Sequence, residues 1–162
     1  MAAGKLKVVV FGSYDAGKST FIQAIDPGAR HVEAHTMDGD TTVALDFGRT
    51  NLHNLQVFLF GTPGQDRFEF VRQTLAYGMD AAILVVDCSV AVDDFTRQLY
   101  RTLVEQGIPL AVMLNKCDLS EACPALARRE LDSALLYEIS ATRPESARNA
   151  LAGFIGTLVK DL

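Results

Sequence analysis

The chain has 162 residues, 49% of them hydrophobic, with 15 basic and 20 acidic side chains that give a formal net charge of −5. This length supports one hydrophobic core, so we expect a single domain over residues 1–162, and the acidic balance excludes a general nucleic-acid partner. No apolar run is long enough to cross a bilayer, no lipid-attachment motif is visible and the three cysteines form no metal-type pair, so we expect a cytoplasmic protein without a direct membrane anchor.

The first strong motif follows residues 6–11, an apolar run that predicts a buried strand. Residues 12–19 read GSYDAGKS and fit the pattern G-x-x-x-x-G-K-[ST], in which backbone N–H groups and the N-terminus of the next helix cradle phosphates. Lys18 would reach the outer phosphates, and the Ser19 hydroxyl would hold a magnesium ion. The predicted nucleotide contacts of this phosphate loop are Gly12, Tyr14, Asp15, Ala16, Gly17, Lys18, Ser19 and Thr20.

A short helix over residues 20–25 should end at Asp26-Pro27-Gly28, because proline cannot continue it. From there to about Thr41 neither the helical nor the strand period is visible, so the sequence predicts a mobile loop. Thr42, at its end, would supply a hydroxyl to magnesium and a backbone N–H to the terminal phosphate. Loss of that phosphate would then release the loop.

Residues 43–47 and 55–60 predict two antiparallel strands joined as a hairpin across residues 51–54. The second strand leads into Gly61-Thr62-Pro63-Gly64-Gln65, the predicted catalytic bend. Here the Gly64 N–H would point at the terminal phosphate and Gln65 would orient the attacking water.

The rest of the chain alternates helices and strands. The apolar spacing predicts strands at residues 81–86, 108–114 and 135–139, which implies an α/β fold with a mostly parallel six-stranded sheet, one antiparallel strand and helices on both faces. Ligands bind such sheets at the carboxyl ends of the strands. Helices are predicted at residues 68–77 and 121–131. Another helix would bury one face formed by Val92, Phe95, Leu99 and Leu103. The last would begin at Pro144, with one apolar stripe of Ala147, Leu151, Phe154, Ile155 and Leu158.

The second strong motif, Asn115-Lys116-Cys117-Asp118, directly follows a predicted strand, and we expect it to select the base of the bound nucleotide. The Asp118 carboxylate would accept two hydrogen bonds from the N1–H and the exocyclic amine of guanine, a donor pair that adenine lacks. Asn115 would tie this loop to the phosphate loop, and Lys116 would lay its aliphatic stem over the base.

After the last strand, Ser140, Ala141 and Thr142 would close over the base, with the Ala141 N–H donating to the guanine carbonyl oxygen. On its own this segment is a weak signal, because small residues before a proline are an ordinary helix start. Together with the other two motifs it predicts GTP or GDP as the bound nucleotide and Mg²⁺ as its metal ion.

With these motifs, the chain resembles small GTPases of the Ras superfamily over nearly all of its length. Residues 42–47 are similar to the T-I-G-V-D-F run of Rab-type members, and residues 64–68 are similar to their G-Q-E-R-F. The pairing of TTVALDFG with FGTPGQ is most similar to the prokaryotic branch. The resemblance implies a three-layer P-loop NTPase fold and a GTP hydrolase that acts as a GTP/GDP switch. It also implies a roadblock-type regulator and effector binding through residues 28–48 and 61–77.

Three positions depart from the family pattern. Gly61 stands where members usually have an aspartate that supports magnesium through water, Tyr14 stands where many have a small residue beside the terminal phosphate, and Thr142 replaces a common lysine. Gly61 and Tyr14 predict slow hydrolysis. They leave open a hydrolysis-deficient scaffold that only binds guanine nucleotide. A small-molecule kinase is a further alternative, but it would give residues 115–118 no role.

Overall fold

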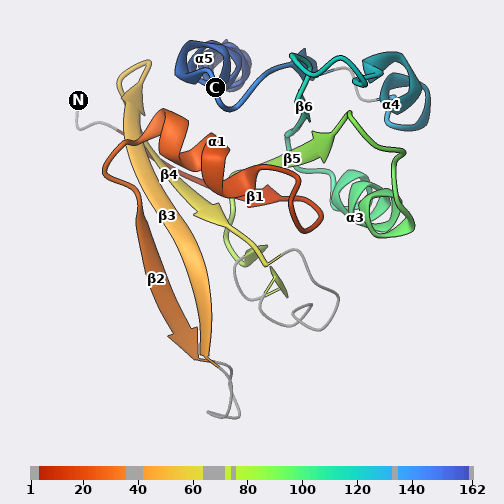
Figure 1. Cartoon of the computed structure of the whole chain (residues 1–162). Coiled ribbons are helices and arrows are strands. Elements are labelled where there is room, and N and C mark those ends of the chain that lie inside the picture. Colours follow the sequence, from red (N-terminus) through yellow and green to blue (C-terminus); the bar gives the residue numbers. More distant parts are fainter. Residues whose placement is uncertain (1–3, 36–41, 64–71, 74–75, 133–134, 161–162) are drawn as a thin grey trace.

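The computed structural model describes residues 4–35, 42–63, 72–73, 76–132 and 135–160. Seven strands form one mixed sheet in the order β2-β3-β4-β1-β5-β6-β7 (Figure 1). The strands are β1 (Gly4–Phe11), β2 (Arg30–His35), β3 (Thr42–Leu52), β4 (Leu55–Gly61), β5 (Ala81–Asp87), β6 (Leu110–Asn115) and β7 (Leu136–Glu138), and the helices are α1 (Lys18–Ile25), α3 (Asp94–Glu105), α4 (Pro124–Glu130) and α5 (Pro144–Lys160).

The sheet has a hydrophobic core on each face. Successive strand residues point to opposite faces, so Val8 and Val10 of β1 join the cluster that contains α1 and α5, while Val9 and Phe11 join the cluster that contains α3 and α4. β5 and β6 are buried along almost their whole length, as parallel strands covered on both sides must be. This arrangement confirms the predicted three-layer α/β fold with helices on both faces.

A two-residue turn connects β3 to β4 and fixes the register of the hairpin. His53 and Asn54 have φ values of 51° and 63°, the left-handed conformation that favours tight hairpin turns. The pairing then runs from Leu52 opposite Leu55 to Asp46 opposite Gly61. The predicted hairpin is confirmed, and its register places Asp46 beside the position at which the family pattern is broken.

The prediction of a mobile loop from residue 28 to about residue 41 is wrong for residues 30–35. This segment forms β2, the edge strand, which pairs antiparallel with residues 42–47 of β3. Its polar residues suit an edge that borders solvent on one side. The sheet therefore has seven strands where six were expected, although β3 is still the one strand that runs against the others.

Helix α3 faces the sheet with a slightly different set of residues from the expected stripe. Thr96, Tyr100 and Leu103 are its buried residues, whereas Phe95 and Leu99 are half-buried. The rotation brings the Thr96 hydroxyl toward the phosphate loop. Of the helix predicted at residues 68–77, residues 72–73 and 76 are helical and most of the rest lies outside the described part of the chain. Among the described residues, no helix is long and apolar enough to span a membrane.

Candidate functional site

The predicted motifs meet at one edge of the sheet, at the carboxyl ends of its parallel strands. Residues 12–17 follow β1, residues 115–118 belong to the end of β6 and the turn after it, and residues 139–142 follow β7. A backbone hydrogen bond from Cys117 N to Ile139 O (3.1 Å) holds the last two segments beside each other, and Cys88 N, just after β5, donates to Asn115 O at 3.0 Å. The edge is the place at which an open α/β sheet binds ligands.

Both glycines of the phosphate loop are required by close contacts as well as by backbone conformation. Gly12 has a φ of 156°, and a Cβ there would lie 2.6 Å from the Val85 carbonyl oxygen. Gly17 has a φ of 104°, and a Cβ there would lie 2.2 Å from the Asn115 amide nitrogen. Any larger residue at position 17 would push the phosphate loop away from residues 115–118, the predicted base-selecting loop.

Lys18 is buried and its side chain folds over the phosphate loop. Its Nζ donates hydrogen bonds of 2.8 Å to the carbonyl oxygens of Gly12 and Ser13. Burial lowers the pKa of Lys18 to about 8, while the nearby carboxylate of Asp46 acts in the opposite direction. A buried ammonium of this kind is stabilised by an anion, so the loop suits a phosphate group.

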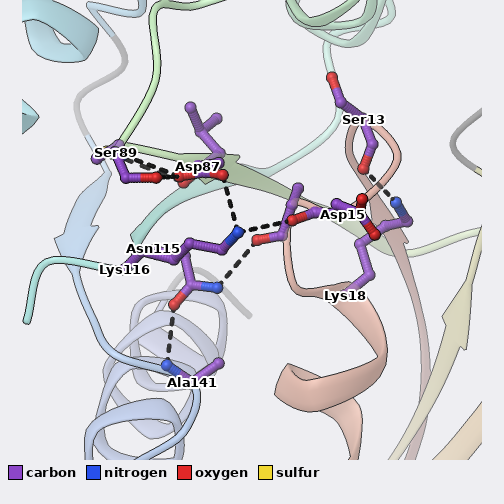
Figure 2. A network of polar contacts seen from close by, with 11 residues as sticks. Ser13, Asp15, Lys18, Asp87, Ser89, Asn115, Lys116 and Ala141 are labelled. Atoms are coloured by element: carbon purple, nitrogen blue, oxygen red, sulfur yellow. Dashed lines mark hydrogen bonds and ion pairs between the residues drawn. The ribbon is translucent and has the colours of Figure 1, made fainter. Parts of the chain in front are cut away.

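Asn115 joins the phosphate loop to the loop after β7 (Figure 2). Its buried side chain donates from Nδ2 to Ala16 O at 3.0 Å and accepts at Oδ1 from Ala141 N at 2.9 Å. The predicted tie between the motifs is therefore present. The Ala141 N–H, predicted to bind the guanine carbonyl oxygen, is directed at Asn115 here, so that contact with the base stays a prediction.

Replacing Asn115 by alanine is expected to lower the free energy of unfolding by about 3 kcal/mol. The substitution leaves the Ala16 carbonyl and the Ala141 N–H buried without their hydrogen-bond partner. Urea unfolding followed by circular dichroism measures this change. Asn149→Ala on the exposed side of α5 is the matched control, expected to change stability by less than about 0.5 kcal/mol. Equal stabilities for the two variants would contradict a structural tie.

Lys116 makes a second tie between the same loops. Its Nζ donates to Asp15 O at 3.0 Å and to the Asp87 carboxylate at 2.8 Å. Burial acts to raise the pKa of Asp87, but hydrogen bonds from Lys116 and Ser89 outweigh it and hold that pKa below its ordinary value. The Lys116 ammonium is thus paired with Asp87, and the aliphatic part of the side chain is the part predicted to contact the base.

Asp118 is exposed in the turn after β6. Among the described residues, none forms a hydrogen bond or ion pair with its carboxylate, which leaves both oxygens available to a ligand. Across the site, the Ser140 and Thr142 hydroxyls bond to each other at 3.0 Å, and Ser146 Oγ accepts from the Ser140 N–H at 3.0 Å. The predicted base-closing residues thus bond to one another, and the Cys117 N to Ile139 O bond joins their segment to the turn that carries Asp118.

Two functional neighbours were missed from the sequence. Ser13 Oγ donates to the Asp93 carboxylate at 2.8 Å and pairs with Thr96 Oγ1 at 2.7 Å, which anchors the phosphate loop to the first turn of α3. Asp46 accepts a hydrogen bond from Ser19 Oγ. A hydroxyl beside a carboxylate is an oxygen donor set that suits a hard cation such as Mg²⁺.

Three predicted residues are not placed by the side-chain geometry. The backbone of Thr42 opens β3 opposite His35, but its hydroxyl lies outside the described part of the structure. Gly64 and Gln65 also lie outside the described residues. Their predicted roles at the terminal phosphate and the attacking water stay predictions.

A comparison with protein families identifies this arrangement. The sequence profile described as "Elongation factor Tu GTP binding domain" matches residues 5–155, which include both glycines of the phosphate loop and the whole of residues 115–118. The chain belongs to this family of GTP-binding domains. The chain is therefore a GTP-binding G domain, and its match to the family includes the phosphate loop and residues 115–118.

Known proteins similar to this G domain differ widely in length. An uncharacterized protein of Methanocaldococcus jannaschii is 32% identical over 121 residues, which cover 75% of this chain and 76% of that protein. Translation initiation factor IF-2 of Syntrophus aciditrophicus is 31% identical over 124 residues, and the match covers 76% of this chain but only 13% of the factor.

Two solved structures share the fold of the G domain. The G domain of the T. maritima FeoB iron transporter superposes with a TM-score of 0.69 at 17% identity, covering 93% of this chain and 99% of that one. A bacterial selenocysteine-specific elongation factor, EF-Sec, gives a TM-score of 0.74 at 18% identity, covering 98% of this chain and 29% of that one. Each likeness supports the same three-layer architecture.

Proposed function

We propose that this G domain is a small GTPase that acts as a GTP/GDP switch with slow intrinsic hydrolysis. The observation that carries the proposal is the pair of ties from Asn115 and Lys116, which hold the phosphate loop against a loop whose Asp118 carboxylate is available. One ligand that bears both phosphates and a guanine base fits this pairing. A small-molecule kinase gives Asp118 no such role.

The residues proposed to hold Mg²⁺ with the nucleotide are Ser19 and Thr42. A hydroxyl from each would complement the phosphate oxygens, since Mg²⁺ favours oxygen ligands. The ion, when bound, neutralises negative charge that develops on the phosphates. Lys18 would bind the outer phosphate oxygens, and release of Thr42 after hydrolysis would change the surface that an effector contacts.

Hydrolysis would depend on Gln65, which we propose to orient the attacking water, and on the Gly64 N–H beside the terminal phosphate. Tyr14 is 68% exposed in the phosphate loop, where its ring would obstruct an arginine inserted by a partner. We expect a single-turnover rate for GTP on the order of 10⁻³ s⁻¹ or slower, as in family members that lack an inserted arginine. Quantifying GDP formed from preloaded GTP measures this rate.

The outcomes of that measurement separate the candidate functions. Slow release of phosphate, lost in Gln65→Leu, supports the switch. Binding of GTP without conversion over many hours supports the hydrolysis-deficient scaffold, the second function that Gly61 and Tyr14 favour. A rate of several per second without a partner would contradict the effect assigned to these two residues, and identifying the nucleotide that co-purifies with the chain gives its resting state.

We further propose that the chain belongs to the prokaryotic branch of the Ras superfamily, acts in the cytoplasm and is controlled by a roadblock-type regulator. Residues 42–47 and 64–68 carry this proposal. An effector would bind through residues 28–48 and 61–77. Arg30 and Arg67 are the two arginines of the chain that we propose a regulator could recruit for catalysis.

The relatives' names do not extend this proposal to translation or iron transport. The chain spans 13% of the initiation factor and 29% of the selenocysteine-specific elongation factor. The segments of those proteins outside the match have no counterpart in the aligned region. The proposed function therefore rests on the guanine-nucleotide site alone.

A further inference from the structure

Gly61 has no side chain, and the space beside it is filled from the neighbouring strand. In the β3–β4 register Gly61 lies opposite Asp46. A Cβ added to Gly61 would lie 3.3 Å from the Asp46 Cβ and 3.6 Å from its Oδ2. A carboxylate carried by β3 therefore occupies the region that a side chain on β4 would enter.

The Asp46 carboxylate is directed toward the phosphate loop. Its Oδ2 accepts a hydrogen bond from Ser19 Oγ, the hydroxyl of the phosphate-loop motif that is predicted to hold Mg²⁺. Its Oδ1 lies 2.8 Å from Nδ1 of His31 in β2, and the Asp46 side chain is only 16% exposed. Both oxygens are thus held in place from two different elements, with one of them at the expected metal site.

We propose that Asp46, on β3, holds the magnesium ion together with Ser19. Its carboxylate takes the place of the aspartate that family members usually carry at the position of Gly61. Mg²⁺ is commonly bound through one or two carboxylates plus substrate phosphates, so a single well-placed carboxylate is sufficient. The inference rests on the Mg²⁺-dependent nucleotide binding proposed above.

The packing leaves space for one carboxylate at this point. Besides its contacts with Asp46, a Cβ at Gly61 would lie 3.0 Å from the Ile22 Cδ1 atom, tighter than almost all real contacts of a Cβ. An acid on β4 would therefore crowd the acid on β3, and one of the neighbouring side chains would have to shift to make room for it. Glycine at residue 61 is therefore what allows the Asp46 side chain to occupy this position.

Binding of GDP across a magnesium titration tests the proposal in Asp46→Asn. With Mg²⁺ in excess, the variant should bind GDP more weakly than the wild type, and its half-saturating Mg²⁺ concentration should rise about 10- to 100-fold. In EDTA the sign should reverse, because loss of a carboxylate beside the phosphates removes repulsion, so the variant should bind GDP at least as tightly as the wild type. A merely structural role for Asp46 would weaken binding in both conditions.

A matched control removes a different carboxylate from the same junction of helix and strand. Asp26 accepts hydrogen bonds from Gly28 N and Arg49 N at 2.9 Å, and no bond to Ser19. Asp26→Asn should keep the wild-type magnesium midpoint. An unchanged midpoint in Asp46→Asn would overturn the proposal.

An exchange of the two residues keeps the test decisive if Asp46→Asn does not fold. The double variant Asp46→Gly with Gly61→Asp returns a carboxylate to the same space from the other strand, and only the flexible end of Ile22 has to shift. The double variant should recover the magnesium dependence of GDP binding that Asp46→Gly alone loses. If its half-saturating Mg²⁺ concentration stays at the value of Asp46→Gly, the two positions do not serve the same metal site. If wild-type binding of GDP does not depend on Mg²⁺ at all, the proposed function fails at its metal step and the role of Asp46 fails with it.

Discussion

Lys18→Ala is expected to abolish tight binding of GDP and GTP while the chain still folds. The variant removes the ammonium that lies 2.8 Å from two carbonyl oxygens of the phosphate loop, so the phosphates lose their buried cation. With nucleotide bound, the Lys18 ammonium is predicted to donate to phosphate oxygens. Hydrogen bonds to charged groups contribute about 1.5–3 kcal/mol each, so losing two such bonds weakens affinity roughly 10²- to 10⁴-fold. Titration calorimetry with GDP measures the loss.

The fold should survive because burial already opposes the charge on Lys18, as its pKa of about 8 indicates. Circular dichroism and thermal unfolding of the nucleotide-free proteins check this expectation. Lys5→Ala at the exposed start of β1 is the matched control, since it removes the same charge at a distance from the loop. GDP affinity that is equal in the two variants would refute the phosphate-loop assignment.

Asp118→Asn should produce the second large effect, a change of base preference. An amide offers one acceptor where the carboxylate offers two, so guanine loses a hydrogen bond and faces a repulsive N–H. A site that holds a polar group through such a pair discriminates by about 10⁴-fold, and we expect most of this factor to be lost for GDP over ADP. Xanthosine diphosphate, whose second carbonyl accepts from an amide, should gain affinity.

That gain is a useful readout, because a misfolded variant would not show it. Glu121→Gln is the matched control: it neutralises another exposed carboxylate a few residues further along. It should leave the preference for guanine unchanged. Wild-type protein that binds ADP as tightly as GDP would refute the assignment of Asp118 without any variant.

The elements that the sequence predicts well are those with a strong apolar period. β5 and β6 are continuous apolar runs, and α5 buries Ala147, Leu151, Phe154 and Ile155 as its spacing requires. β2 was missed because its six residues, RHVEAH, are mostly polar. Their alternation around Val32 and Ala34 is too short to outweigh the glycine and polar residues on either side.

Most of the site could also be predicted, because phosphate loops and base-selecting loops are local motifs. Asp46 belongs to neither motif, and its role depends on a contact between two strands. It was nevertheless within reach: a two-residue turn at His53 and Asn54 pairs each β3 residue with a definite β4 partner, and Gly61 is the partner of Asp46. The predicted hairpin did not specify which two residues formed its turn.

The catalytic bend at Gly64 and Gln65 is a different case. Its motif is specific, but Gly64 and Gln65 lie outside the described residues. The part of the chain that the structure describes ends at Pro63 on one side and resumes at Arg72 on the other. The positions of these residues relative to an attacking water thus follow from neither the spacing of the sequence nor the described contacts.

The ties made by Asn115 and Lys116 also bear on how fast nucleotide leaves. They hold the backbone of Ala16 and Asp15 through contacts within the protein, so much of the conformational entropy of the phosphate loop is lost during folding and not when nucleotide arrives. Such preorganisation lengthens the residence time of a ligand more than it speeds its entry. Spontaneous exchange of GDP should therefore be slow, and a protein that accelerates it would have to break these ties by pulling the two loops apart.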